Sequence, residues 1–149
     1  MTKLNKSTRY ALHAALELAS RGASEEPVTV ASMAGRHAIP AAVLAKVLQQ
    51  LVRAGIAVGT RGAHGGYRLA RPPSQVTLAE VIEAFEPARP DDDDTAGRPH
   101  ALDDEEHRLR EMLDRVDEMA RSTFASLTLE TLVRRPVGEL GAAARRSNR

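Results

Sequence analysis

Residues 56–72 read IAVGTRGAHGGYRLARP, and this stretch says most about how the chain folds. Residues 56–58 favour a short strand and residues 67–69 favour its partner. The glycines between them permit a tight loop, and that loop carries Arg61. The pattern predicts a small basic hairpin over residues 56–69. It does not match the glycine-rich loops that bind phosphates, since it has neither their spacing nor a helix directly after it.

Three helices are expected before this hairpin. Apolar residues recur at three- and four-residue steps from Leu4 to Ala19 and predict a first helix. Thr29 can cap a short second helix. Pro40 suits the first position of a third helix, because the N–H that proline lacks would be unpaired there. Gly55 ends this helix. Two short helices joined by a tight turn form a helix-turn-helix, and a hairpin straight after one is a wing.

The exposed face of the third helix and the wing form the candidate DNA-binding surface. Alanine lets a helix approach base edges closely and can touch a thymine methyl group, and Gln49 can pair with adenine. Lys46 and Arg53 can reach phosphates or guanine, and an arginine on the wing can enter a minor groove. The predicted DNA-binding residues are Thr29, Ala41, Ala42, Ala45, Lys46, Gln49, Arg53, Arg61, Gly62, His64 and Gly65.

The charges of the 149 residues are distributed unevenly, although the formal net charge is only +1. Residues 1–71 hold ten basic and three acidic side chains, and residues 80–118 hold five basic and fifteen acidic ones. A basic first half is typical of a nucleic-acid-binding module, although uneven surface composition would look the same.

Composition disfavours several other classes of protein. The chain has no cysteine, which removes disulfides, thiolate nucleophiles and thiolate-bound metals. No apolar run approaches the ~20 residues of a membrane span, and the N-terminal stretch has the pattern of a helix rather than a signal peptide. No catalytic Ser/His/Asp set or acid–base pair stands out. We therefore expect a cytoplasmic protein that is not an enzyme and has no membrane partner.

The second half predicts a long amphipathic helix that begins near Leu102. Its apolar residues follow steps of seven, then four and three, which is a narrow heptad-like seam. Such a seam needs a partner, either a second copy of the chain or the same subunit. The predicted dimer-interface residues are Leu102, Leu109, Leu113, Val116, Ala120 and Leu127.

Three stretches resemble the IscR/NsrR family of bacterial winged-helix transcriptional regulators: LNKSTRYALHAALELA (4–19), VASMAGRHAIPAAVLAKVLQQLVRAGIAVGTRGAHGGYRLARP (30–72) and VTLAEVIEAFE (76–86). The resemblance covers about residues 3–134, and the RGxxGGYxL wing is its most specific part. It implies a homodimeric DNA-binding regulator, usually a repressor. The third helix would enter the major groove and Arg61 the minor groove of a near-palindromic operator.

The chain departs from this family in its sensor. Cluster-binding members hold an iron–sulfur centre with three cysteines in the loop before the dimer helix, where this chain has Asp91 to Asp94. Because clusters need thiolates, none of the family kind is expected, and no cofactor is assigned. His100, Asp104 and His107 could instead hold a divalent metal, but a solvated acidic helix start explains them as well. The sequence neither supports nor excludes a small-molecule or protein effector.

A smaller departure lies in the turn of the helix-turn-helix, where Ala38 replaces a glycine that many relatives have. Alanine can adopt a compatible turn with negative φ, or it strains the turn slightly.

The predicted fold class is mostly α: a winged helix-turn-helix with a small two-stranded wing and a long C-terminal dimerisation helix. The expected parts are a DNA-binding domain (1–86), an acidic loop (87–101), the dimerisation helix with a short C-terminal helix (102–134) and a disordered basic tail (135–149). The predicted function is sequence-specific transcriptional regulation by a homodimeric repressor without a cluster. The alternatives are a regulator that senses a ligand or metal through His100 and His107, and a winged-helix module for protein–protein contact.

Overall fold

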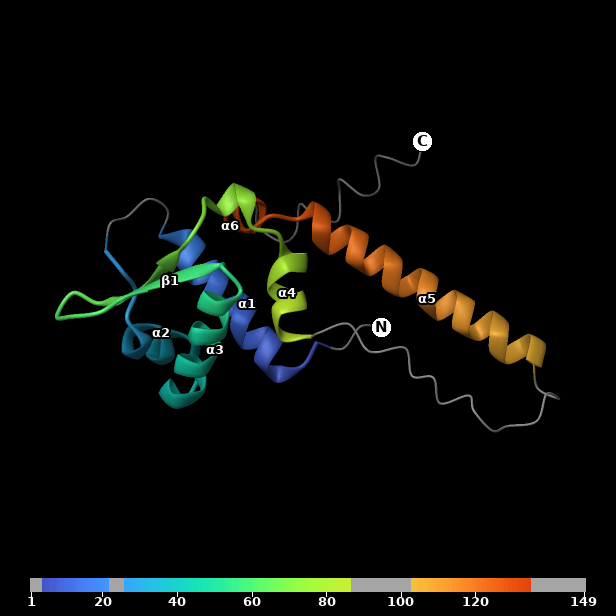
Figure 1. Cartoon of the computed structure of the whole chain (residues 1–149), viewed down its shortest axis with the longest axis horizontal. Helices are drawn as coiled ribbons and strands as arrows, with labels where there is room; N and C mark the ends of the chain where they lie inside the picture. The colour runs from blue at the N-terminus through green and yellow to red at the C-terminus, as the bar shows by residue number, and fades with distance from the viewer. Residues whose placement is uncertain (1–3, 22–25, 87–102, 135–149) are drawn as a thin grey trace.

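A computed structural model of the chain describes residues 4–21, 26–86 and 103–134. The predictions for the acidic loop, His100, Leu102 and the basic tail lie outside these residues. The described elements are α1 (Lys6–Ser20), α2 (Val30–His37), α3 (Ala41–Arg53), β1 (Ala57–Thr60), β2 (Gly66–Leu69), a short 3-10 helix η1 (Pro73–Gln75), α4 (Leu78–Phe85), α5 (Asp103–Ser126) and α6 (Leu129–Arg134). Figure 1 shows a helical body, a hairpin that projects from it, and the long α5. This arrangement confirms the predicted mostly α fold with a two-stranded wing and a long C-terminal helix.

The core of the body lies around α1, which packs against α2, α3, α4 and α6. The buried face of α1 consists mainly of alanine, which lets the other helices approach closely. Larger aliphatic side chains fill the remaining space, because only 3% of the residues are aromatic. The fully buried apolar residues include Met33, Leu44, Leu48, Leu51, Ile56 and Val81.

The start of α1 is joined to the end of α4. Asn5 caps α1, and its Oδ1 accepts a hydrogen bond of 2.8 Å from the backbone N–H of Thr8. The Oε1 of Glu86 accepts from the backbone N–H of Asn5 and from the hydroxyl of Thr8, both at 2.9 Å. The Thr8 hydroxyl is therefore satisfied although the residue is fully buried.

The turn between α2 and α3 uses a left-handed alanine. Ala38 has φ 52° and ψ 41°, so the expectation of a negative-φ turn is wrong and the strained alternative holds. The reason is tertiary: this turn ends α2, lets the backbone N–H of Ile39 donate to Ala34, and buries Ile39. Left-handed backbone costs an alanine about 1–2 kcal/mol. Pro40 also differs from expectation, because its ψ of 130° makes it the N-cap of α3 rather than its first residue.

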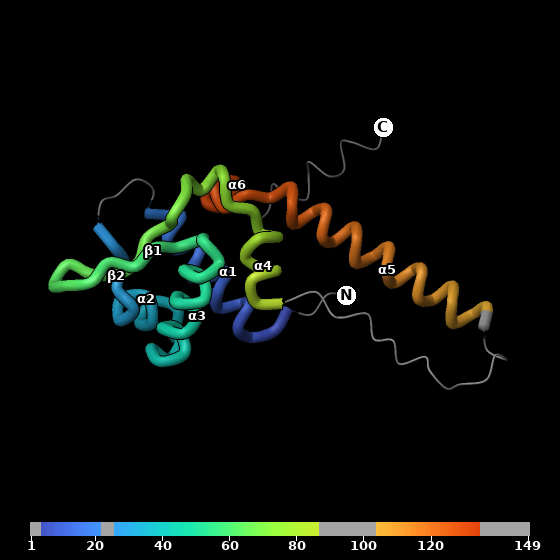
Figure 2. The backbone as a smooth tube through the Cα atoms, viewed as in Figure 1, coloured from blue at the N-terminus to red at the C-terminus, as the bar shows by residue number. Residues whose placement is uncertain are grey.

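The wing is a two-stranded antiparallel sheet in which Ala57 pairs with Leu69 and Thr60 pairs with Gly66. The first strand begins one residue later than predicted and extends to Thr60, while Ile56 is buried just before it. The backbone trace in Figure 2 shows the hairpin reaching beyond the helices on the side of α2 and α3.

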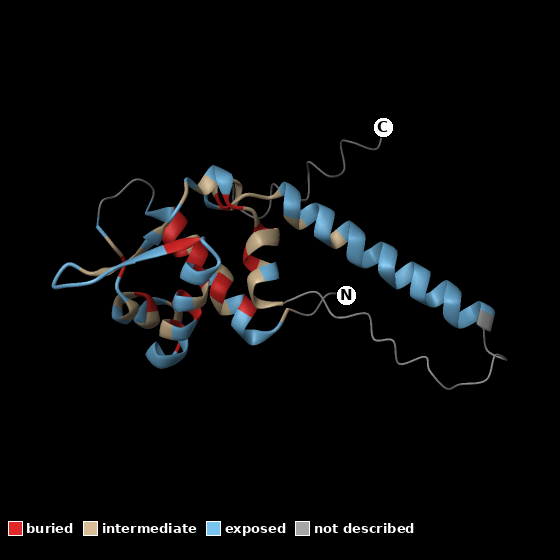
Figure 3. Cartoon of the chain, in the orientation of Figure 1, coloured by how far each residue is buried: buried red, intermediate tan, exposed pale blue. Residues whose placement is uncertain are grey.

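The long helix α5 extends away from the body, and most of it is exposed in Figure 3. Its C-terminal end lies against α4, where Phe124 is partly buried. Leu127 lies beyond the last residue of α5. Its side chain packs against the core of its own chain, and its carbonyl accepts a 2.8 Å hydrogen bond from Leu78. Among the helices described here, none is both long and apolar enough to cross a membrane.

Candidate nucleic-acid interface

The predicted DNA-binding residues of α3 lie on its outward face. Lys46, Gln49 and Arg53 are exposed, and they share one face because they are three and four residues apart. The opposite face of the helix buries Leu44, Val47, Leu48 and Leu51 in the core. The helix therefore presents two cations and an amide to solvent while its inner face anchors it.

The wing and α3 meet at one surface hollow, which we call the α3–wing surface. Residues of both elements line it: Gln49, Val52, Arg53, Gly59, Thr60, Arg61, Gly66 and Tyr67. The fold thus brings Gln49 and Arg53 of α3 to the same place as Arg61 of the wing. Two guanidinium groups and an amide beside one hollow can bind phosphate oxygens and base edges together. Sequence reasoning did not identify Val52, Thr60 or Tyr67 as part of this surface.

The start of α3 has a different character. Ala41 and Ala42 are exposed and Ala45 is half-buried. Pro40 provides no side-chain cap, so the first backbone N–H groups of α3 have no capping side chain. Thr29, the remaining predicted residue from this region, caps α2 by accepting from the backbone N–H of Ser32 at 3.2 Å.

The loop of the wing depends on its glycines. Gly62 has a φ of +113°, and its carbonyl accepts a 2.9 Å hydrogen bond from the backbone N–H of Gly65. A Cβ on Gly65 would lie 2.5 Å from the carbonyl oxygen of Thr60. No side chain can therefore occupy this position in the same loop. The closed loop leaves the side chains of Arg61 and His64 exposed.

The base of the wing is paired with the segment before α2. Val28 and Tyr67 exchange two backbone hydrogen bonds of 2.8 Å each. A Cβ on Gly66, whose φ is +154°, would lie 2.6 Å from the carbonyl oxygen of Val28. The pairing fixes the wing relative to the helix-turn-helix, and the sequence contained no local signal for it.

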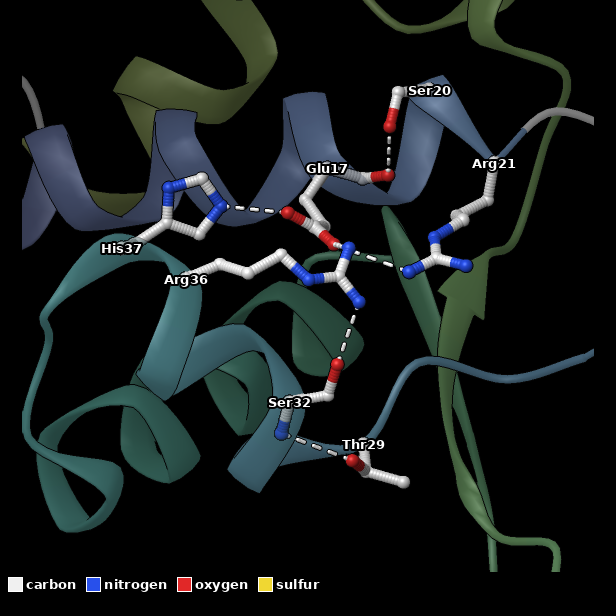
Figure 4. A network of polar contacts seen from close by, with 7 residues as sticks. All are labelled: Glu17, Ser20, Arg21, Thr29, Ser32, Arg36 and His37. Atoms are coloured by element: carbon white, nitrogen blue, oxygen red, sulfur yellow. Dashed lines mark hydrogen bonds and ion pairs between the residues drawn. The ribbon is translucent and has the colours of Figure 1, made fainter.

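A buried carboxylate joins α1 to α2 (Figure 4). The side chain of Glu17 is only 7% exposed, and its Oε2 lies 2.7 Å from Nε2 of His37. Its Oε1 accepts a hydrogen bond from Arg36 and lies 3.7 Å from Arg21. Because an ionised carboxylate only accepts, the Nε2 of His37 is the donor. Arg36 and His37 end α2 directly before the turn into α3, so this network fixes the helix behind the candidate interface. In the sequence, the sign of this network was a charged residue, Glu17, among the apolar residues of the first helix.

A second ion pair joins the end of the wing to α4. The guanidinium of Arg71 donates to Oε1 of Glu80 at 2.7 Å, and Oε2 accepts from the backbone N–H of Thr77 at 2.9 Å. Thr77 and Glu80 form a capping box at the start of α4. Partial burial raises the pKa of Glu80, but the Thr77 N–H and the Arg71 guanidinium together hold that pKa below its ordinary value of 4.5.

The described metal candidates lie apart from this surface, on the exposed start of α5. Nε2 of His107 lies 3.3 Å from Oε1 of Glu111, one turn along the same helix. In residues 4–21, 26–86 and 103–134, no three His, Asp or Glu side chains come together as a metal site. Asp104 and His107 therefore lack a third described ligand.

Comparison with known proteins agrees with this geometry. Residues 4–135 match the Rrf2 family, described as "Iron-dependent Transcriptional regulator". The HTH-type transcriptional regulator BadM of Rhodopseudomonas palustris is 36% identical over 98% of this chain and 96% of its own length. CymR of Bacillus subtilis is 30% identical over 92% of this chain and 94% of its own length. The solved structure of that CymR, named the global cysteine regulator, has a TM-score of 0.72 and covers 89% of this chain and 97% of its own.

The iron in the family description can be tested against the donors of this chain. An iron–sulfur cluster is held by cysteine thiolates, with histidine as an occasional substitute. The sequence has no cysteine, so a thiolate-held cluster does not fit it.

Proposed function

The chain belongs to the Rrf2 family of transcriptional regulators, and we propose that it binds a near-palindromic operator as a homodimeric repressor that carries no iron–sulfur cluster. Proteins of this family are regulators and not enzymes. The partner is double-stranded DNA, and we place the complex in the cytoplasm. Residues 1–86 would bind DNA, and residues 102–134 would form the dimer.

The observation that carries the proposal is the α3–wing surface. It brings Gln49 and Arg53 of α3 beside Arg61 of the wing. With α3 in the major groove, Gln49 can pair with adenine while Arg53 and Lys46 contact phosphates or guanine. The wing then lies over the adjacent backbone, where Arg61 can enter the minor groove and respond to its width and negative potential. The net positive charge of residues 1–71 favours the same partner.

The proposed dimer rests on α5. Leu109, Leu113 and Val116 are 56%, 51% and 43% exposed, and they form one stripe on a helix that extends away from the body. Exposed leucines in a regular stripe favour a second apolar surface, and an identical stripe from a second copy supplies one by two-fold symmetry. Because these side chains are already about half covered, burying the rest would contribute roughly 1 kcal/mol each. The two helix-turn-helix units would then lie about one DNA turn apart, ~34 Å.

The test is selection of duplexes from a random pool by the full-length chain, followed by footprinting. We expect an inverted repeat with two protected segments whose centres are about 34 Å apart. Affinity should fall steeply as salt rises, because phosphate contacts release counterions. A chain that enriches no sequence and shows no salt-dependent binding would instead be a module for protein–protein contact.

A further inference from the structure

The first half of α3 offers DNA only apolar side chains. Residues 40–45 read PAAVLA, and none of these side chains can donate or accept a hydrogen bond. Ala41, Ala42 and Val43 are exposed, and Val43 is 39% exposed despite its size. The first polar side chain on the outward face is Lys46. This half of the helix therefore cannot recognise a base by side-chain hydrogen bonds.

Hydrogen-bonding base edges are poorly matched to such a surface. Placing alanine against the amino group of cytosine or adenine removes water from a donor without replacing the hydrogen bond, which costs binding free energy. The only apolar group in the major groove is the C5-methyl of thymine. Ala42 and Ala45 lie one turn before Lys46 and Gln49 on the same face, so they would meet neighbouring base pairs.

We infer that the chain recognises thymine C5-methyl groups through Ala42 and Ala45, a specificity that rests on the proposed DNA-binding function. The helical rise of about 1.5 Å per residue puts Ala45 about 6 Å and Ala42 about 10 Å from Gln49 along the helix. At a base-pair rise of about 3.4 Å, the methyl groups then lie about two and three base pairs from the adenine that Gln49 contacts. The operator half-site therefore contains thymine at these positions, and the methyl group itself carries the discrimination.

The experiment replaces single thymines of the selected operator with deoxyuridine, which removes only the methyl group. Affinities of the full-length chain are measured by fluorescence anisotropy at one salt concentration. At one or two positions of each half-site, the substitution should weaken binding about three- to fivefold, the effect of one buried methyl group. Thymines outside the footprint should change the affinity less than about twofold, and they serve as the control.

A variant pair assigns the effect to the alanines. Ala42→Gly and Ala45→Gly remove the methyl groups of the protein, so the ratio of the deoxyuridine and thymidine affinities should fall toward one at the matching position. Gln49→Ala should weaken binding to both duplexes equally and leave that ratio unchanged. A ratio does not depend on how much of the variant is folded.

The outcomes separate this inference from the proposed function. An enriched operator that tolerates deoxyuridine at every thymine, or that has no thymine within three base pairs of the Gln49 contact, overturns the inference and leaves the proposed function standing. A chain that enriches no operator overturns the proposed function itself. Unchanged ratios in both glycine variants would also overturn the assignment to Ala42 and Ala45.

Discussion

Val28 and Tyr67 exchange two backbone hydrogen bonds of 2.8 Å, and this pair holds the wing against the segment that leads into α2. Thr29, the N-cap of α2, directly follows Val28. The wing and the helix-turn-helix are therefore one mechanical unit, so a change at the base of the wing should alter how both approach DNA.

Gly66→Ala tests this coupling. Its Cβ would lie 2.6 Å from the carbonyl oxygen of Val28, at a φ of +154° that alanine rarely adopts. We expect a loss of about 1–3 kcal/mol in the free energy of unfolding and at least a tenfold weaker operator affinity. Urea unfolding and anisotropy measure the two effects. Gly35→Ala is the matched control, because its Cβ meets nothing within 4 Å and helical alanine is favoured. Full operator affinity in Gly66→Ala would contradict the coupling.

Arg61→Ala tests the role of the wing in DNA binding. Arg61 is exposed and lines the α3–wing surface, so its loss should leave folding unchanged. We expect operator binding to weaken by about 1–3 kcal/mol, with less discrimination between A·T-rich and G·C-rich flanks. Arg121→Ala removes the same charge from an exposed position on α5 and should change the affinity by less than about 0.5 kcal/mol. If both variants lost the same operator affinity, Arg61 would contribute only its positive charge and would have no specific role in the wing.

Leu113→Glu tests the dimer. It places a carboxylate in the middle of the exposed stripe of α5, where burial against a second copy would desolvate the charge. Sedimentation velocity should show a monomer for this variant and a dimer for the wild type. Affinity for the inverted repeat should approach that for a single half-site, because the second contact is no longer intramolecular. Asp114→Lys changes an exposed residue on the other face of α5 and should remain dimeric. A dimeric Leu113→Glu would exclude this stripe as the interface.

The Arg71–Glu80 pair predicts a pH dependence of stability. The pKa of Glu80 is held below 4.5, so the folded state favours the ionised carboxylate. Its stabilising contribution is present above pH 4.5 and is lost as the pH falls through the folded-state pKa. We therefore expect the urea midpoint of the wild type to exceed that of Glu80→Gln at pH 6–7 and to converge with it once the pH lies below the folded-state pKa of Glu80. Glu83→Gln, an exposed change on the same helix, controls for the lost charge. A difference that persists unchanged into acid would contradict the assignment.

The sequence predicted elements that depend on short-range signals. The third helix lies between Pro40 and Gly55 as predicted, and Thr29 caps α2 as its residue type indicated. Glycines and alternation identified the wing. These features depend on neighbours three or four residues away, so one sequence is sufficient for them.

Features that depend on distant contacts could not be predicted. The left-handed Ala38 follows from burying Ile39, which competes with the backbone preference of alanine. The Val28–Tyr67 pairing and the network of Glu17 join segments that sequence spacing does not relate. For the candidate site, the sequence indicated the residues but not that Gln49 and Arg61 line the same hollow.

The central claim is specific operator binding by a chain that cannot hold a thiolate-bound cluster. The most direct measurement compares the dissociation constants for the selected operator and for a scrambled duplex of equal length and composition, in EDTA at 150 mM salt. We predict a preference for the operator of at least about a thousandfold. Equal affinity for the two duplexes, or a preference that appears only when iron is supplied, would contradict it.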